Sequence, residues 1–150
     1  MSLSIKGPWS HQEIGQYLGR AEFPIRLSCS GGDGYPRLVS LWYQYRDGVV
    51  YCVTHKDSKI ASLIAADDRV AFEVSTNETP YSGVRGQAQA TLKPLGDSPV
   101  LSELLNHYLG GVDSSLANWL LSRSDEELLI TLRLRRVFSW DYRERMAVGA

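Results

Sequence analysis

The very short connections between its β-prone segments constrain the fold of this chain more than any other feature. Apolar and polar residues alternate over residues 23–29, and a second β-prone segment spans about residues 36–45. The dipeptide Asp47-Gly48 is a strong hairpin signal, and it joins this segment to a third one at residues 49–54. Strands joined by such turns pair antiparallel, since a parallel pair needs a long crossover. The first half of the chain is therefore predicted to form an antiparallel sheet.

Three more strands are predicted after residue 69. They cover about residues 70–74, 82–93 and 128–140, and the last is too apolar to remain an uncovered edge. The segment 82–93 has small residues, including Gly86 and Ala88, on the face that it turns inward. Small inward residues indicate a tightly curved sheet or the close approach of another segment.

Four short helices are predicted before and between these strands. The first begins with a capping box at Ser10, the second begins near Asp57 or Ser58, and the third is capped by Ser98. The fourth covers about residues 115–122. Its buried side is expected to carry Leu116, Trp119 and Leu120. About six strands with few helices predict an α+β protein whose antiparallel sheet curls into a small closed or partly closed barrel.

Length and composition indicate an ordinary globular protein. The 150 residues suit one domain, which is expected to span residues 1–150. The formal net charge of −1 argues against a protein whose main task is to bind nucleic acid. No stretch approaches the ~18 apolar residues of a membrane helix, and the N-terminus lacks the apolar region of a signal peptide. With Cys29 and Cys52 expected as free thiols, we predict a soluble, cytoplasmic protein.

The common catalytic and metal-binding motifs are missing. The three histidines are scattered, without the spacing of a metal site, and neither a nucleophile elbow nor a P-loop occurs. One local arrangement suits an anion, because a strand ends at Val53-Thr54 and a helix starts with Ser58-Lys59. Free N–H groups at a helix start, a hydroxyl and an ammonium can hold a phosphate, and Arg37 or Arg85 could add a guanidinium. The alternative interpretation is a capped helix with a solvated lysine.

Several segments follow one another in a specific order and spacing. They are Arg37-Leu38-Val39-Ser40-Leu41-Trp42, Asp47-Gly48, Val53-Thr54 with Ser58-Lys59, and Val84-Arg85-Gly86-Gln87-Ala88. Over about residues 23–92 this series resembles the pyridoxamine 5'-phosphate oxidase-like flavoproteins. The closing Phe138-Ser139-Trp140-Asp141 is similar to the final strand of the short members. The resemblance implies a six-stranded antiparallel split β-barrel of Greek-key type, α+β in class, with short flanking helices.

The resemblance also implies a homodimer with two FMN sites at the subunit interface. The strand of residues 37–42 would lie along the isoalloxazine ring, with its backbone amides at the polar edge of the flavin. Arg37, Ser58 and Lys59 would hold the phosphate, and Val53-Thr54 would line the site beside it. Arg85 would reach the phosphate or the ring, and Trp140 would contribute from the partner chain. The predicted cofactor-binding residues are therefore Arg37, Leu38, Val39, Ser40, Leu41, Trp42, Val53, Thr54, Ser58, Lys59, Arg85 and Trp140.

A small FMN-dependent oxidoreductase is the function that the resemblance implies. The flavin would carry the electron chemistry, so no catalytic acid or base and no metal is expected from the protein. The oxidases proper have a C-terminal substrate motif with a Trp and an Arg-x-His-x-Arg run, and Arg143-Glu144-Arg145 does not replace it. The small-molecule substrate is therefore open, and pyridoxamine phosphate is not expected.

Three alternatives remain at this stage. The cofactor could be a deazaflavin relative of FMN, or the barrel could be a non-enzymatic module that binds or carries flavin, deazaflavin or haem. It could also be an apo barrel in which Arg37, Ser58 and Lys59 are ordinary surface groups.

Overall fold

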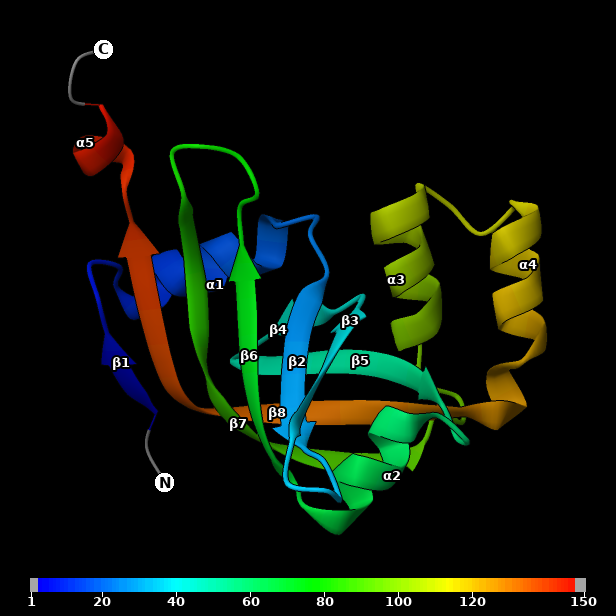
Figure 1. Cartoon of the computed structure of the whole chain (residues 1–150). Helices are drawn as coiled ribbons and strands as arrows, with labels where there is room; N and C mark the ends of the chain where they lie inside the picture. Colours follow the sequence, from blue (N-terminus) through cyan, green and yellow to red (C-terminus); the bar gives the residue numbers. More distant parts are fainter. Residues whose placement is uncertain (1–2, 148–150) are drawn as a thin grey trace.

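A mostly antiparallel sheet of eight strands dominates the computed structural model, which describes residues 3–147 (Figure 1). The strands are β1 (Ser4–Lys6), β2 (Ile25–Ser30), β3 (Pro36–Leu41), β4 (Gln44–Arg46), β5 (Val49–His55), β6 (Arg69–Ser75), β7 (Ser82–Pro94) and β8 (Glu127–Asp141). Their order is β3-β2-β6-β7-β8-β5-β4, with β1 parallel to β8. β3 and β4 lie at the two ends of this path, so the barrel is split rather than closed.

The long strand β8 links the two halves of the sheet. It bends in Figure 1, so that its first half, residues 127–133, pairs with β5 and its second half pairs with β1. Along most of its length it also pairs with β7, with a bulge opposite Gln87 and Ala88. The predicted apolar last strand is thus covered and paired on both sides. The antiparallel α+β architecture is confirmed.

The expected number of six strands is wrong, because the segment 36–45 is two strands and β1 was not predicted. The break lies at Tyr43, whose side chain is only 2% exposed. Its hydroxyl donates to the carbonyl of Leu18 at 2.7 Å, and its backbone N–H donates to the hydroxyl of Tyr108 rather than to a strand. Burying Tyr43 in this way sends β4 to the opposite end of the sheet path from β3.

The four predicted helices are present, and a fifth follows β8. They are α1 (His11–Arg20), α2 (Lys59–Ala66), α3 (Val100–Leu109), α4 (Ser115–Ser122) and α5 (Arg143–Met146), with a 3₁₀ turn, η1 (Ser124–Glu126), before β8. The capping box at Ser10 is confirmed, and Ser58 caps α2 as predicted. Pro99 rather than Ser98 occupies the cap position of α3, and no side chain caps this helix.

The expected buried side of α4 is partly wrong. Leu116 and Trp119 are 48% and 53% exposed, and the fully buried residue is Ala117. The reason is that α4 packs mainly on α3, away from the strands (Figure 1), so only a narrow stripe is covered. The ring of Trp119 instead lies under the guanidinium of Arg123, 4.4 Å from its centroid.

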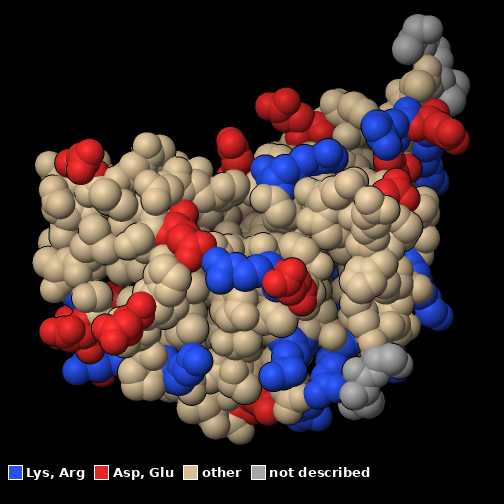
Figure 2. Space-filling model, turned by 180° about the vertical axis from the view of Figure 1, so that it is seen from behind, with Lys and Arg blue, Asp and Glu red and all other residues tan. Residues whose placement is uncertain are grey.

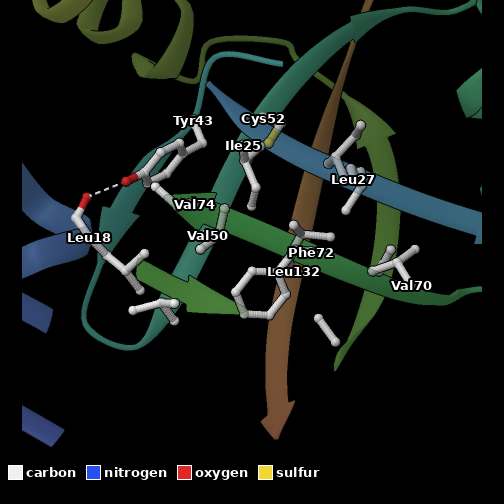
Figure 3. Packing of buried hydrophobic residues seen from close by; sticks show 14 of the residues in the cluster. Leu18, Ile25, Leu27, Tyr43, Val50, Cys52, Val70, Phe72, Val74 and Leu132 are labelled. Atoms are coloured by element: carbon white, nitrogen blue, oxygen red, sulfur yellow. Dashed lines mark hydrogen bonds between the residues drawn. The ribbon is translucent and has the colours of Figure 1, made fainter. Parts of the chain in front are cut away.

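Two hydrophobic cores form inside this architecture. The larger core fills the barrel and includes Ile25, Leu27, Phe72 and Leu132 (Figure 3). The smaller core lies between the α3–α4 hairpin and the beginning of β8, around Leu105. Both cysteines are buried free thiols. None of the described helices is long and apolar enough to cross a membrane.

Asp141 ties the N-terminal segment to the end of β8. Its carboxylate accepts hydrogen bonds from Arg143 at 2.5 Å and from the indole N–H of Trp9 at 3.3 Å, and these contacts, with Arg143 foremost, lower its pKa. A carboxyl whose pKa is lower in the folded state stabilises the fold fully above the unfolded pKa of about 3.9 and loses this contribution as pH falls through the folded value.

The variant Asp141→Asn should therefore lose less of its free energy of unfolding than the wild type when the pH is lowered below about 4. Urea denaturation at neutral and acidic pH measures the difference. Asp113→Asn, at an exposed position between α3 and α4, is the control. Equal acid sensitivity of Asp141→Asn and wild type would contradict the prediction.

Candidate cofactor-binding site

The outer face of the sheet carries two rows of residues that cross six strands. Register assigns Lys6, Phe138, Arg85, Glu73, Arg26 and Ser40 to the first row. It assigns Ser4, Arg136, Gln87, Ala71, Ser28 and Leu38 to the second row. Because side chains alternate across a strand, these residues point away from the barrel core that their neighbours fill. All except Ser40 line one groove of about 900 Å³, here called the outer groove.

Positive charge predominates in the outer groove. Four basic side chains line it against the single carboxylate of Glu73: Lys6, Arg26, Arg85 and Arg136. Such an excess favours an anionic ligand. Over much of the face seen in Figure 2, Lys and Arg lie next to Asp and Glu.

Arg85 and Trp140, two of the predicted residues, lie together on the outer face. The guanidinium of Arg85 is 5.2 Å from the ring centroid of Trp140 and 5.3 Å from that of Phe138, both within the range of a cation–π contact. Trp140 therefore contacts Arg85 of its own chain. Its contribution to a partner's site stays a prediction.

The predicted strand 37–42 does not act as one surface, because its side chains alternate between two faces. Leu38 and Ser40 belong to the outer face, where Leu38 is 74% exposed. Val39 and Leu41 turn inward and pack against the barrel core. The strand nevertheless lies at one end of the sheet path, next to β2 only, so one of its backbone edges is open to a ligand.

The start of α2 combines two hydroxyls with a helix N-terminus. Thr54, at the end of β5, donates from Oγ1 to Oγ of Ser58 at 2.9 Å. The same Oγ accepts the N–H of Ala61 at 3.2 Å. Lys59 is the first residue of α2, and its side chain is exposed. The first N–H groups of a helix have no carbonyl partner inside it, so this arrangement can bind an anion such as a phosphate.

Arg37 is engaged elsewhere. Its Nη2 lies 3.0 Å from a carboxylate oxygen of Asp33, in the loop between β2 and β3. The backbone N–H of Tyr35, together with Arg37, lowers the pKa of Asp33. Within residues 3–147, no hydrogen bond or ion pair joins Arg37 to Thr54, Ser58 or Lys59. Its role in phosphate binding stays a prediction.

A second, smaller cleft lies beside β3. It measures about 280 Å³, and its lining includes Leu41, Trp42 and Val53 of the predicted set together with Glu127. Trp42 stacks on Tyr108 of α3, with ring centroids 5.2 Å apart and planes within 7°. Sequence reasoning missed Glu127, which reaches the cleft from a segment distant in sequence, and Tyr108, which stacks on Trp42. It also missed Lys6, Arg26 and Arg136 of the outer groove, while Arg85 was among the predicted residues.

No protein-family model matches the chain, and no curated protein sequence matches it. Solved structures do. The conserved hypothetical protein Rv2991 from Mycobacterium tuberculosis is similar with a TM-score of 0.78 and 24% identity, over 93% of this chain and 89% of that one. A FAD-binding protein from Mesorhizobium loti has a TM-score of 0.65 at 21% identity, over 87% and 93% of the two chains.

A putative pyridoxamine 5'-phosphate oxidase from Listeria innocua has a TM-score of 0.61 at 11% identity, over 84% of this chain and 94% of that one. An F420 reductase and the heme storage protein HutZ from Vibrio cholerae are similar as well, with TM-scores of 0.62 and 0.63. The chain therefore has the split-barrel fold of the pyridoxamine 5'-phosphate oxidase-like proteins, as its sequence resemblance predicted.

Proposed function

We propose that the chain is a homodimeric, FMN-dependent oxidoreductase acting on a small molecule other than pyridoxamine phosphate. The observation that carries the proposal is the anion-binding arrangement at the start of α2, placed on a fold that a FAD-binding protein shares.

The residues present fit an FMN molecule. The hydroxyl of Ser58, which Thr54 holds in place, the first N–H groups of α2 and the ammonium of Lys59 supply donors for a phosphate. The open edge of β3 offers backbone amides for the polar edge of a flavin ring, and Trp42 offers an aromatic surface nearby. When bound, FMN would supply the hydride or electron transfer, while the protein binds and orients it.

The homodimer is supported by the outer face. Leu38 is 74% exposed and Phe138 is 44% exposed, and both lie on the outer groove. Exposed apolar side chains on a concave face are typical of an interaction surface. The surplus of basic residues there would make two copies repel unless anions lie between them, which agrees with an anionic cofactor at the interface.

A deazaflavin cofactor is the second candidate, favoured by the shared fold with an F420 reductase. Haem is a third candidate, favoured by the shared fold with the heme storage protein HutZ.

The visible absorption spectrum of the purified chain, before and after addition of FMN, tests the proposal. Flavin bands at near-equimolar occupancy that NAD(P)H bleaches are the expected result. A chain that binds FMN without reduction by any donor would instead be a carrier. A chain that neither contains nor takes up FMN, but binds F420, would favour the deazaflavin alternative.

The variant Lys59→Ala should bind FMN about 10- to 100-fold more weakly, because it loses one charge-assisted contact to the phosphate. Fluorescence quenching of FMN on binding measures the affinity. Lys56→Ala is the matched control, since Lys56 is an exposed lysine in the loop just before α2. Unchanged affinity in Lys59→Ala would show that the phosphate lies elsewhere.

A further inference from the structure

We propose that the cleft between β5 and the α3–α4 hairpin binds a small aromatic cation, held by the carboxylate of Glu127. The cleft, called the Glu127 cleft below, is lined by Leu41, Trp42, Val53, Leu104, Leu120 and Glu127, among others. Naming this ligand a substrate rests on the proposed flavin function. Its binding does not depend on that function.

The pairing of β5 with β8 fixes the face on which Glu127 lies. Glu127 is the first residue of β8 and pairs with His55, while Leu129 pairs with Val53. Residues two apart in a strand share a face. Leu129 belongs to the core beneath the α3–α4 hairpin, so Glu127 lies on the same face of β8, toward that hairpin. The side chain of Glu127 is only 8% exposed, and it forms part of the cleft wall.

The carboxylate of Glu127 has no hydrogen-bond partner among the described residues. Within residues 3–147 the structure shows no hydrogen bond to it, and its one ion-pair neighbour is Arg123, with Nη2 4.0 Å from Oε1. That distance exceeds hydrogen-bond length. Arg123 is drawn toward the ring of Trp119, 4.4 Å from its centroid. The carboxylate oxygens of Glu127 are therefore free to accept a hydrogen bond, and a cationic donor that enters the cleft would form a charge-assisted one.

The other walls of the cleft favour a ligand with an apolar or aromatic ring. The side chains of Leu41, Val53, Leu104 and Leu120 supply aliphatic walls, and Trp42, fixed by its stack on Tyr108, supplies an aromatic one. The volume of about 280 Å³ lies near the lower limit of ligand pockets. Apolar walls with one buried anion therefore suit a compact ring that carries a single cationic or N–H donor group.

The position of the cleft suits a substrate. It shares Leu41 and Trp42 with the strand segment predicted to lie along the flavin ring. A ligand with its cationic group at Glu127 would thus have its ring on the side of the cofactor site. Binding at Glu127 would position the ligand without any proton transfer.

Benzylamine, which is cationic at neutral pH, is the probe, with neutral benzyl alcohol and anionic benzoate as matched analogues. Titration calorimetry on the full chain without FMN measures binding, and quenching of tryptophan fluorescence reports occupancy near Trp42. Benzylamine should bind at least 10-fold more tightly than either analogue, the scale of one hydrogen bond to a charged group. Glu127→Gln should remove this preference, and Glu126→Gln, at the exposed neighbouring position, should retain it.

A second variant covers the case in which Glu127→Gln does not fold. Leu120→Phe, on the half-buried side of α4, should reduce the volume of the cleft and weaken all three probes together. Equal affinities of the three probes in the wild-type chain would overturn the proposal, as would a Glu127→Gln variant that keeps the preference. Competition between FMN and benzylamine would also overturn it, because the flavin would then occupy the cleft. A chain that fails to bind FMN but still prefers benzylamine would refute the proposed function and leave the proposed ligand of the cleft supported.

Discussion

The variant Gly86→Ala is expected to lower the free energy of unfolding by about 3 kcal/mol or more, a large effect for the addition of one methyl group. A Cβ at this position would lie 1.9 Å from the carbonyl oxygen of Arg136 and 3.1 Å from the ring of Phe72. The oxygen belongs to the backbone of β8, beside the bulge in its pairing with β7, so it cannot rotate away as a side chain would. The central strand pair of the barrel must separate instead.

Gly19→Ala is the matched control for this prediction. Gly19 lies in α1, where a Cβ would meet nothing within 4 Å. Alanine there should stabilise the chain by about 0.5–1 kcal/mol, since it favours the helix and restricts the unfolded chain. Urea denaturation of both variants measures the contrast. Similar stabilities would mean that the β7–β8 pair adapts to the added carbon.

Local signals in the sequence predicted the elements well, because the interactions behind them span few residues. The capping box at Ser10 depends on a residue three positions away, and the Asp47-Gly48 turn fixes one hairpin by backbone preference alone. The small inward residues of β7 correctly indicated a close approach, which Gly86 makes to β8. The alternation of apolar and polar residues then predicted which side chains of each strand point into the core.

Features that depend on distant partners were not predictable in this way. The break at Tyr43 requires hydrogen bonds to Leu18 and Tyr108, which lie 25 and 65 positions away. The apolar stripe of α4 predicted a buried face, but periodicity cannot say whether another element is there to cover it. Trp119 is accordingly half exposed.

The candidate site also combines features that the sequence predicts with features that it does not. The hydroxyl arrangement of Thr54 and Ser58 is local, and the order of the segments in the sequence was enough to suggest it. The ion pair of Arg37 with Asp33 is also local, since the two residues lie four positions apart across the turn between β2 and β3. Glu127 could not be found in sequence, because its surroundings come from β3, β5, α3 and α4 together.

The variant Leu38→Glu is expected to convert the proposed homodimer into a monomer. Leu38 is 74% exposed on the outer groove, so a carboxylate there remains hydrated in the single chain, and its folding stability should change by less than about 0.5 kcal/mol. In a dimer formed through this face the same carboxylate would lose its hydration and the apolar contacts of Leu38, and this cost of burial exceeds what ion pairs with the basic residues of the groove return. The substitution is therefore expected to leave the folding of the single chain nearly unchanged and to destabilise the dimer strongly.

Light scattering at micromolar concentration distinguishes the two states of this chain of 16.8 kDa. The wild type should show twice the chain mass, and Leu38→Glu should show the chain mass with an unchanged urea midpoint. Leu116→Glu is the control, because Leu116 is 48% exposed but lies on α4, outside the outer groove, and should leave the dimer intact. If Leu38→Glu stays dimeric, the subunits meet through another face. If it is monomeric yet keeps FMN at wild-type affinity, one chain completes the cofactor site alone, and Trp140 of a partner is not required.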